Sequence, residues 1–157
     1  MLDVVFTIGP DSRQTLYDTW RLAGKVLNEA DRASQLVESM DGFVDDLDSR
    51  TADRSESERR SAYVGAINYK GAQGIETTRN PFDPFRLTGT ANVAAGVESE
   101  APSVQISIEK LLEWDPATAF VSTRNTERVK QDIREHPGLR QVAAIADEDV
   151  HKIPPIA

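Results

Sequence analysis

A short apolar segment that runs straight into a long polar loop is the feature that most constrains the fold. Residues 62–67 (AYVGAI) have the length and composition of a buried strand, and residues 68–80 (NYKGAQGIETTRN) then supply polar side chains around two glycines. A helical pattern at residues 108–114 leads into a second buried strand at 119–122, and a third strand is expected at the end of residues 144–154. Strands that alternate with helices pair in parallel through right-handed crossovers. The sequence therefore predicts an α/β fold, a three-layer Rossmann-like lobe with a mainly parallel sheet.

The first third of the chain carries a helical pattern. Apolar side chains at spacings of three and four form one stripe, which resumes after a break at residues 28–31. The stripe consists of Leu16, Trp20, Ala23 and Leu27, and then of Ala33, Val37, Met40, Val44 and Leu47. We expect residues 1–60 to hold a leading strand (residues 4–8) and a connecting helical region with a long helix. Residues 61–157 would then be the α/β ligand-binding lobe, and the two regions could also form one compact domain.

Polar clusters follow two of the predicted strands. In a parallel α/β sheet, ligands bind beyond the carboxyl ends of the strands. Asn68, Tyr69 and Lys70 follow the first strand, while Thr123 and Arg124 follow the second. The Tyr69 ring could stack on a flat ligand or ligate ferric iron, or it could simply pack on the loop. These residues are the predicted ligand contacts.

Arginine supplies the charge that such a site would use. The guanidinium fork of Arg79 or Arg124 suits an anionic group, although either side chain could instead form a local salt bridge. We add Arg79 to the predicted ligand contacts because it lies in the same polar loop as Tyr69.

Catalytic and metal chemistry find little support in the sequence. The two histidines, His136 and His151, have no spacing typical of a metal motif, and the glycines form neither dinucleotide nor phosphate-loop patterns. No acid and base pair is indicated, and Cys is absent. We therefore expect a protein that is not an enzyme, with no catalytic residues, no bound metal and no cofactor.

The charge of the chain bears on its partners. With 26 Asp and Glu against 18 Lys and Arg, the net charge is −8, which disfavours nucleic acid because that partner needs a concentrated cationic surface. No apolar run is long enough to span a membrane, and the first residues (MLDVVFTIGPD) lack the pattern of a signal peptide. Nucleic acid is therefore not expected as a partner.

Four segments, in order, resemble the substrate-binding proteins of ABC importers that carry iron siderophores, haem or cobalamin. They are LYDTWRLAGKVLNEADRASQLVE at 16–38, YVGAINYKGAQG at 63–74, VQISIEKLLEWDPATAFVS at 104–122 and AIADEDVHKIP at 144–154. The resemblance covers nearly all of residues 3–154. Those proteins have two lobes joined by a connecting helix, and this chain is similar to the connecting region and the carboxy-terminal lobe.

The resemblance implies a function and several partners. It implies capture of a ferric chelate or a related small molecule outside the cytoplasm, with an export signal in a part of the protein not included here. It also implies that Glu109, in the SIEKL element, docks on the membrane permease; the alternative is that Glu109 only favours the amino-terminal end of its helix. The isolated lobe is expected to self-associate. Two other classes stay open: a lobe of a metallocluster-related enzyme component, which the absence of Cys disfavours, and a stand-alone sensory or interaction domain.

Overall fold

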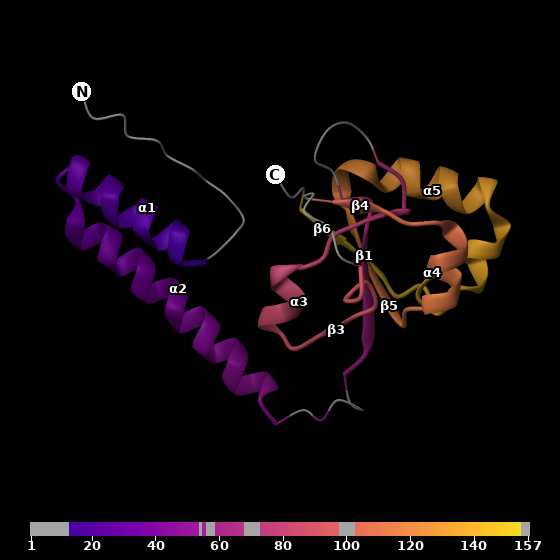
Figure 1. The fold of residues 1–157 in the computed structure, drawn as a ribbon, viewed down its shortest axis with the longest axis horizontal. Coiled ribbons are helices and arrows are strands. Elements are labelled where there is room, and N and C mark those ends of the chain that lie inside the picture. Colours follow the sequence, from indigo (N-terminus) through magenta and orange to yellow (C-terminus); the bar gives the residue numbers. More distant parts are fainter. Residues whose placement is uncertain (1–12, 54, 56–58, 68–72, 98–102, 155–157) are drawn as a thin grey trace. The chain divides into compact units, whose positions relative to one another are not determined.

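The computed structural model describes residues 13–53, 55, 59–67, 73–97 and 103–154 of the chain (Figure 1). The chain divides into two compact units, Met1–Arg50 and Thr51–Ala157. The predicted leading strand at residues 4–8 lies outside the described residues.

The first unit is a helical hairpin. Helix α1 (Arg13–Val26) and helix α2 (Ala30–Thr51) are joined by a tight turn, in which Asn28 has a left-handed backbone with φ of 59°. The helices approach closely at Gly24, where an added Cβ would lie 2.6 Å from the Cβ of Ala33. Further along, the Tyr17 hydroxyl donates to Asp41 Oδ1 at 2.7 Å. The break between the helices falls where the sequence predicts it.

The predicted apolar stripe is confirmed at three positions of α2, whereas in α1 its members Leu16, Trp20 and Ala23 are only half-buried. In α2, the predicted Ala33, Val37 and Val44 are buried. In α1 the buried residues are Tyr17 and Gly24, and the side chain of Leu27, just beyond the helix, is 70% exposed. The reason is physical: a glycine lets the helices approach and a tyrosine adds a hydrogen bond across them, which an apolar periodicity does not register.

The second unit is built on a six-stranded sheet with the order β4-β2-β1-β5-β6, in which β3 also pairs with β1. The strands are β1 (Ser61–Gly65), β2 (Thr77–Thr78), β3 (Ala91–Asn92), β4 (Val104–Gln105), β5 (Thr118–Ser122) and β6 (Val150–Ile153). The predicted strands β1, β5 and β6 are parallel, with Gly65 opposite Val121 in the β1–β5 pair, and β3, which the sequence does not predict, is also parallel to β1. Strands β2 and β4 are antiparallel to their neighbours.

Helices cover both faces of this sheet, which gives three layers. Three helices follow strand β4 along the chain: α4 (Ile108–Trp114), α5 (Thr126–Glu135) and α6 (Ala143–Ala146). Two 3₁₀ helices lie directly before and after α5: η2 (Thr123–Asn125) and η3 (Pro137–Gln141). In Figure 1, α4 and α5 lie on one side of β1 and β5, and α3 (Asp83–Leu87) lies on the other. The predicted three-layer Rossmann-like lobe with a mainly parallel sheet, preceded by a long helix, is confirmed.

Alternate strand residues face the two layers. Tyr63, Ala119 and Val121 pack with Leu111, Val129 and Leu139 on the side of α4 and α5. On the other side, Ala62 and Val64 pack with Phe82 and Phe85, and Phe120 contributes from β5. Phe82 and Phe85, which follow β2 along the chain, are both buried. The helix α3 that carries Phe85 was not predicted.

Helix α4 has the bounds that the sequence predicts, and Ser107 caps it. The Ser107 hydroxyl accepts a hydrogen bond from the Lys110 amide at 3.1 Å, as an N-cap does. Asp115 ends the helix in a left-handed conformation with φ of 40°, and its carboxylate accepts from the Ala143 amide at 2.7 Å. Asp115 therefore ends α4 and also holds the start of α6.

Candidate ligand-binding edge

The carboxyl ends of β1 and β5 meet at one edge of the sheet. Gly65 pairs with Val121, so Ala66 and Ser122 follow side by side. Ala66 is buried and turns the chain with a φ of 54°. The Asn125 side-chain amide donates to the Ala66 carbonyl at 2.7 Å, which ties the turn after β5 to the end of β1.

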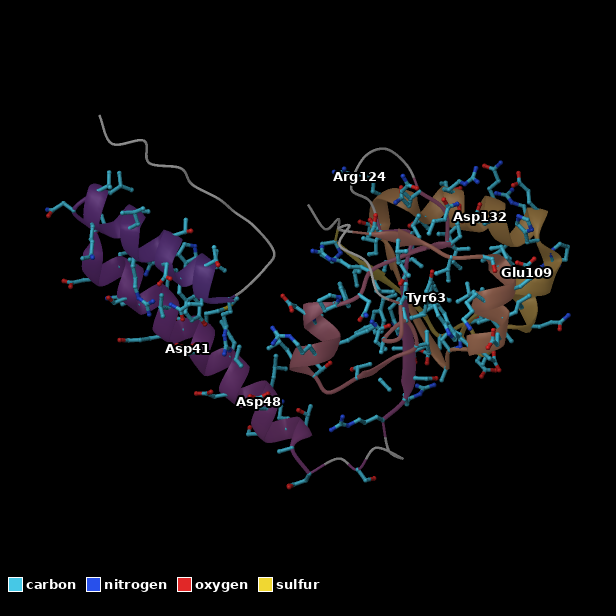
Figure 2. The ribbon with its side chains drawn as sticks, in the orientation of Figure 1. Asp41, Asp48, Tyr63, Glu109, Arg124 and Asp132 are labelled. Carbon is cyan, nitrogen blue, oxygen red and sulfur yellow. The ribbon has the colours of Figure 1, made fainter. Side chains whose placement is uncertain are left out.

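Thr123 and Arg124 lie on this edge in η2, and both are exposed. Figure 2 shows Arg124 at the end of α5 that adjoins the edge. None of the described acidic side chains forms a salt bridge with Arg124. A guanidinium left without an ion pair there is available for an anionic group.

Two buried polar atoms at the same place have no partner among the described residues. They are Ser122 Oγ and Asn125 Oδ1, on residues that are each 1% exposed. Buried polar atoms nearly always have a hydrogen-bond partner, and the exceptions call for an explanation such as a bound water or ligand. The edge beside β5 therefore combines exposed cationic charge with unused hydrogen-bonding capacity.

The other predicted ligand contacts do not all reach this edge within the described residues. Asn68, Tyr69 and Lys70 lie outside the residues that the structure describes. Arg79 follows β2, which runs antiparallel to β1 with Thr78 opposite Gly65. The chain at Arg79 has therefore turned back from the carboxyl edge toward the middle of the sheet.

Two buried side chains hold Ile75, which lies in the polar loop just before β2. Asp132 Oδ2, on α5, accepts the Ile75 amide at 2.8 Å, and the Tyr63 hydroxyl, on β1, donates to the Ile75 carbonyl at 2.6 Å. Arg128 Nε balances the carboxylate charge from 3.0 Å. Burial raises the pKa of the Tyr63 phenol far above its ordinary value, so this hydroxyl keeps the proton that it donates.

Glu109 lies in the first turn of α4, away from Arg124 (Figure 2). Its side chain is exposed, and hydrogen bonds from its own amide and from the Ser107 hydroxyl lower the pKa of the carboxyl. The carboxylate is thus held in the charged form at the surface, which fits both a docking role and a purely local role at the helix start.

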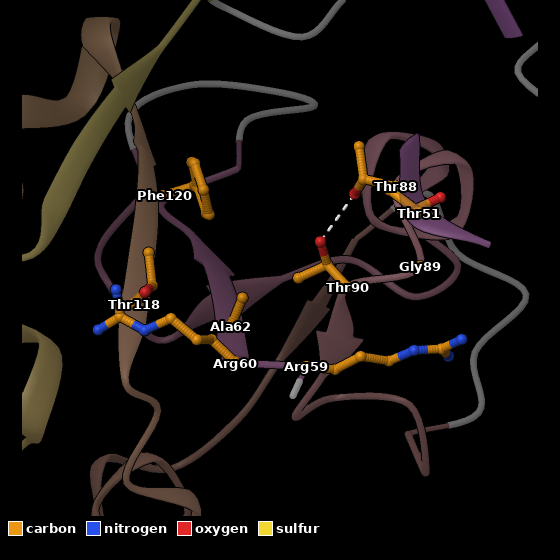
Figure 3. Close-up of a pocket in the computed structure, with 9 residues that line it drawn as sticks. All are labelled: Thr51, Arg59, Arg60, Ala62, Thr88, Gly89, Thr90, Thr118 and Phe120. Carbon is orange, nitrogen blue, oxygen red and sulfur yellow. Dashed lines mark hydrogen bonds between the residues drawn. The ribbon is translucent and has the colours of Figure 1, made fainter. Parts of the chain in front are cut away.

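A small hollow in the second unit lies at the opposite ends of the strands (Figure 3). Ala62 and Thr118, at the start of β1 and β5, line it together with Arg59 and Arg60, and its volume is about 180 Å³. Its polar groups mostly bond to one another or to Asp149: Thr88 to Thr90 at 2.7 Å, and Thr118 and Arg60 to Asp149 at 3.0 and 2.9 Å. Typical ligand pockets span ~300–1,000 Å³, so this hollow is a poor ligand site.

Within the described ranges, no group of three or more His, Cys, Asp or Glu side chains is placed to hold a metal ion. None of the described helices has both the length and the apolar character needed to cross a membrane.

Asp132 and Tyr63 are the residues that the sequence reasoning missed. Asn125, Val129 and Asp132 recur at spacings of four and three, so they share the inward face of α5, and all three are buried. A charged residue on an apolar helix face was the available signal for Asp132. Tyr63 gave no signal, because a tyrosine in a buried strand is ordinary packing material.

Comparison with protein families gives one match over nearly the whole chain. The family described as periplasmic binding protein matches residues 3–157. Comparison with curated proteins gives no match.

Solved structures share the fold. The molybdate periplasmic binding protein MolA of Haemophilus influenzae is 24% identical with a TM-score of 0.71, over 89% of this chain and 41% of MolA. The ABC-type Fe3+-hydroxamate transport system protein of Saccharomonospora viridis is 23% identical with a TM-score of 0.65, over 94% of this chain and 50% of that protein. The periplasmic haem binding protein HutB of Vibrio cholerae is 19% identical with a TM-score of 0.67, over 91% of this chain and 55% of HutB. The chain thus spans about half the length of the proteins whose fold it shares.

Proposed function

We propose, because this chain belongs to the periplasmic binding protein family, that it is part of the solute-binding component of an ABC importer. In this proposal it works outside the cytoplasm and captures an iron complex or a related metal chelate. The similar structures support this class of ligand, since they include an Fe3+-hydroxamate transport protein and a haem binding protein. The molybdate protein widens the class to oxyanions. Family and neighbours are binding proteins, which favours this function over the enzyme and sensory alternatives.

The observation that carries the proposal is the edge beside β5. Among the described residues, Arg124 is exposed without an ion pair, and Ser122 Oγ and Asn125 Oδ1 are buried without a hydrogen-bond partner. An anionic ligand group on Arg124 would use a charge that the lobe itself leaves unused. Asn68, Tyr69, Lys70, Arg79 and Thr123 remain predicted contacts in this proposal.

We further propose that a second lobe completes the site. The chain corresponds to between 41% and 55% of the three similar structures, and a cleft enclosed from one side only supplies part of the contacts. The chain alone should therefore bind weakly, with a dissociation constant above about 1 µM.

Nuclear magnetic resonance can test this proposal on the chain itself, because it detects weak binding. The probes are gallium(III) desferrioxamine B, gallium(III) protoporphyrin IX and molybdate, which are diamagnetic. We expect one of them to shift the amide signals of Ile67, Thr123 and Arg124, and Arg124→Ala to weaken that binding. Arg59→Ala, which removes an arginine from the opposite ends of the strands, is the matched control. If no probe shifts these amides at millimolar concentration, the proposed function is wrong.

Glu109 is the proposed contact with the permease. In the whole transporter, Glu109→Ala should lower uptake and leave ligand affinity unchanged, since a rim charge steers and registers docking. Glu113→Ala is the control, because Glu113 is an exposed glutamate on the same helix that already pairs with Lys110 at 3.0 Å. Equal effects of the two substitutions on uptake would contradict a specific role for Glu109.

A further inference from the structure

Both backbone polar groups of Ile75 are engaged by side chains from two other elements. Its amide donates to Asp132 Oδ2 on α5, and its carbonyl accepts from the Tyr63 hydroxyl on β1, at 2.8 and 2.6 Å. Ile75 and Asp132 are each 2% exposed and Tyr63 is fully buried. Such a two-sided hold fixes the position of a peptide unit more firmly than packing of the Ile75 side chain alone.

Burying the Asp132 carboxylate to accept one backbone hydrogen bond carries a high desolvation cost. Burying a charge is costly unless it is paired, and here Arg128 Nε provides the pairing at 3.0 Å. A charged acceptor in return makes a shorter and stronger hydrogen bond than a neutral one. The chain also makes room for it, since a Cβ on Gly74 would lie 2.6 Å from Asp132 Oδ2.

Hydrogen bonds also fix the backbone on either side of Ile75. The Thr77 hydroxyl donates to the Gly74 carbonyl at 2.8 Å, and the Thr77 amide bonds to the same carbonyl at 3.2 Å. Residues 74–77 therefore form a braced turn that leads from the carboxyl edge into β2. Helix α5, which braces it, continues directly from η2, where Thr123 and Arg124 lie.

We propose that Asp132 and Tyr63 are positioning residues that clamp Ile75 and so hold the turn at residues 74–77, the end of β1 and η2 as one rigid ligand-binding edge. The bond from Asn125 to the Ala66 carbonyl is the third brace between the same elements. This inference rests on the proposed function. Its physical benefit is preorganisation: an edge that is ordered before the ligand arrives loses less conformational entropy on binding.

Hydrogen exchange of the Ile75 amide tests the clamp without a ligand. In Asp132→Asn we expect this amide to exchange at least about tenfold faster, because the charged acceptor is replaced by the neutral amide oxygen of asparagine, which accepts a weaker hydrogen bond and no longer forms an ion pair with Arg128. The Ala119 amide, which bonds to the Asp149 carbonyl at 3.0 Å, should be unchanged and serves as the internal control. The control variant is Asp149→Asn. The Asp149 carboxylate bonds to the Thr118 hydroxyl and to Arg60, and it lies at the amino ends of the strands, away from Ile75. Unchanged Ile75 exchange in Asp132→Asn would overturn the clamp.

Ligand affinity tests the positioning role. With whichever of the three probes the wild-type chain binds, we expect Asp132→Asn to weaken binding by about tenfold and Asp149→Asn to leave it unchanged. If Asp132→Asn does not fold, Tyr63→Phe serves instead, because it removes only the hydroxyl. The ring stays packed against the Trp114 ring, whose centroid lies 6.4 Å from its own. Normal affinity in a variant whose Ile75 amide exchanges faster would overturn the positioning role.

A double variant separates positioning from general loss of stability. Since both side chains act through Ile75, Tyr63→Phe with Asp132→Asn should weaken binding by less than the product of the two single effects. Effects that multiply would overturn the shared clamp. If the wild-type chain binds none of the probes, the proposed function fails, while hydrogen exchange still decides whether the clamp exists.

Discussion

Removing the Ser122 hydroxyl should stabilise the lobe. Ser122 is 1% exposed and its Oγ has no hydrogen-bond partner among the described residues. A buried hydroxyl without a partner costs about 1–3 kcal/mol by mutational data, and Ser122→Ala removes that cost. The lost van der Waals contacts of one oxygen amount to ~0.1–0.2 kcal/mol each, so a net gain of about 1–2 kcal/mol in the free energy of unfolding is expected.

Thr78 offers the matched control. It is also fully buried, but its hydroxyl donates to the Val64 carbonyl at 2.7 Å. Thr78→Val keeps the shape and loses that bond, so it should lower the free energy of unfolding by about 0.5–1.5 kcal/mol. The two variants should thus move the stability in opposite directions, although each deletes one buried hydroxyl.

Thermal unfolding followed by circular dichroism provides the measurement. For a chain of 157 residues 1 kcal/mol moves Tm by ~2–4 °C, so Ser122→Ala should melt a few degrees above the wild type and Thr78→Val a few degrees below. If Ser122→Ala melts below the wild type, as Thr78→Val does, the Ser122 hydroxyl has a partner and the reasoning is refuted. If Ser122→Ala is more stable but binds the probe less well, the hydroxyl is retained for the ligand at the expense of stability.

Three further predictions concern other parts of the second unit. Leu111→Ala, at a fully buried position between α4 and the sheet, should lower the free energy of unfolding by about 2–5 kcal/mol in urea titrations; a loss below about 1 kcal/mol would contradict its place in the core. The pKa of Asp149 is lowered, first by the hydrogen bond from Thr118, so its contribution to stability is present at neutral pH and is lost as the pH falls through that lowered pKa. Asp149→Asn should therefore flatten the acid side of the curve of stability against pH, and an unchanged curve would contradict this. Ser107→Ala should raise the pKa of Glu109 part of the way to its ordinary value, because one of two hydrogen bonds to the carboxylate is lost. A carboxyl titration by nuclear magnetic resonance measures this, and an unchanged pKa would mean that the bond from the Glu109 amide alone lowers it.

The parts of the fold that could be predicted depend on local signals. Ser107, directly before residues 108–114, caps α4, since serine is a favoured residue at that position, and Asp115 ends the helix. Strands β1 and β5 were visible because each is a run of apolar residues that is buried on both faces, as in parallel sheets. Such signals lie within a few residues of the element that they specify.

The parts that could not be predicted depend on long-range partners. Strands β2 and β4 have two residues each and form only because they pair with each other and with β1, which no local pattern encodes. Helix α3 begins at Asp83-Pro84 within a loop that reads as turns, and its stability comes from Phe85 in the core.

The candidate site divides in the same way. Thr123 and Arg124 were predicted from their position after a strand, and the structure puts them at the carboxyl edge beside Ala66. Asp132 bonds to a backbone amide 57 residues away, so its role depends on a contact that only the folded chain creates. The antiparallel direction of β2 likewise decides where Arg79 lies.

The two faces of the sheet differ in how firmly they are covered within the second unit. On one face α4, α5 and α6 pack over a continuous apolar core, whereas on the other the five-residue helix α3 meets the sheet through aromatic rings. Phe85 packs edge-on against Phe82 at 4.8 Å and against Phe120 at 5.4 Å. A fluctuation that releases α3 breaks few contacts and leaves the larger core intact, so the lobe should visit a partly unfolded state in which residues 83–87 have detached. A protease would then cut within these residues before the rest of the lobe unfolds, and the rate of that cut would report the population of the partly unfolded state.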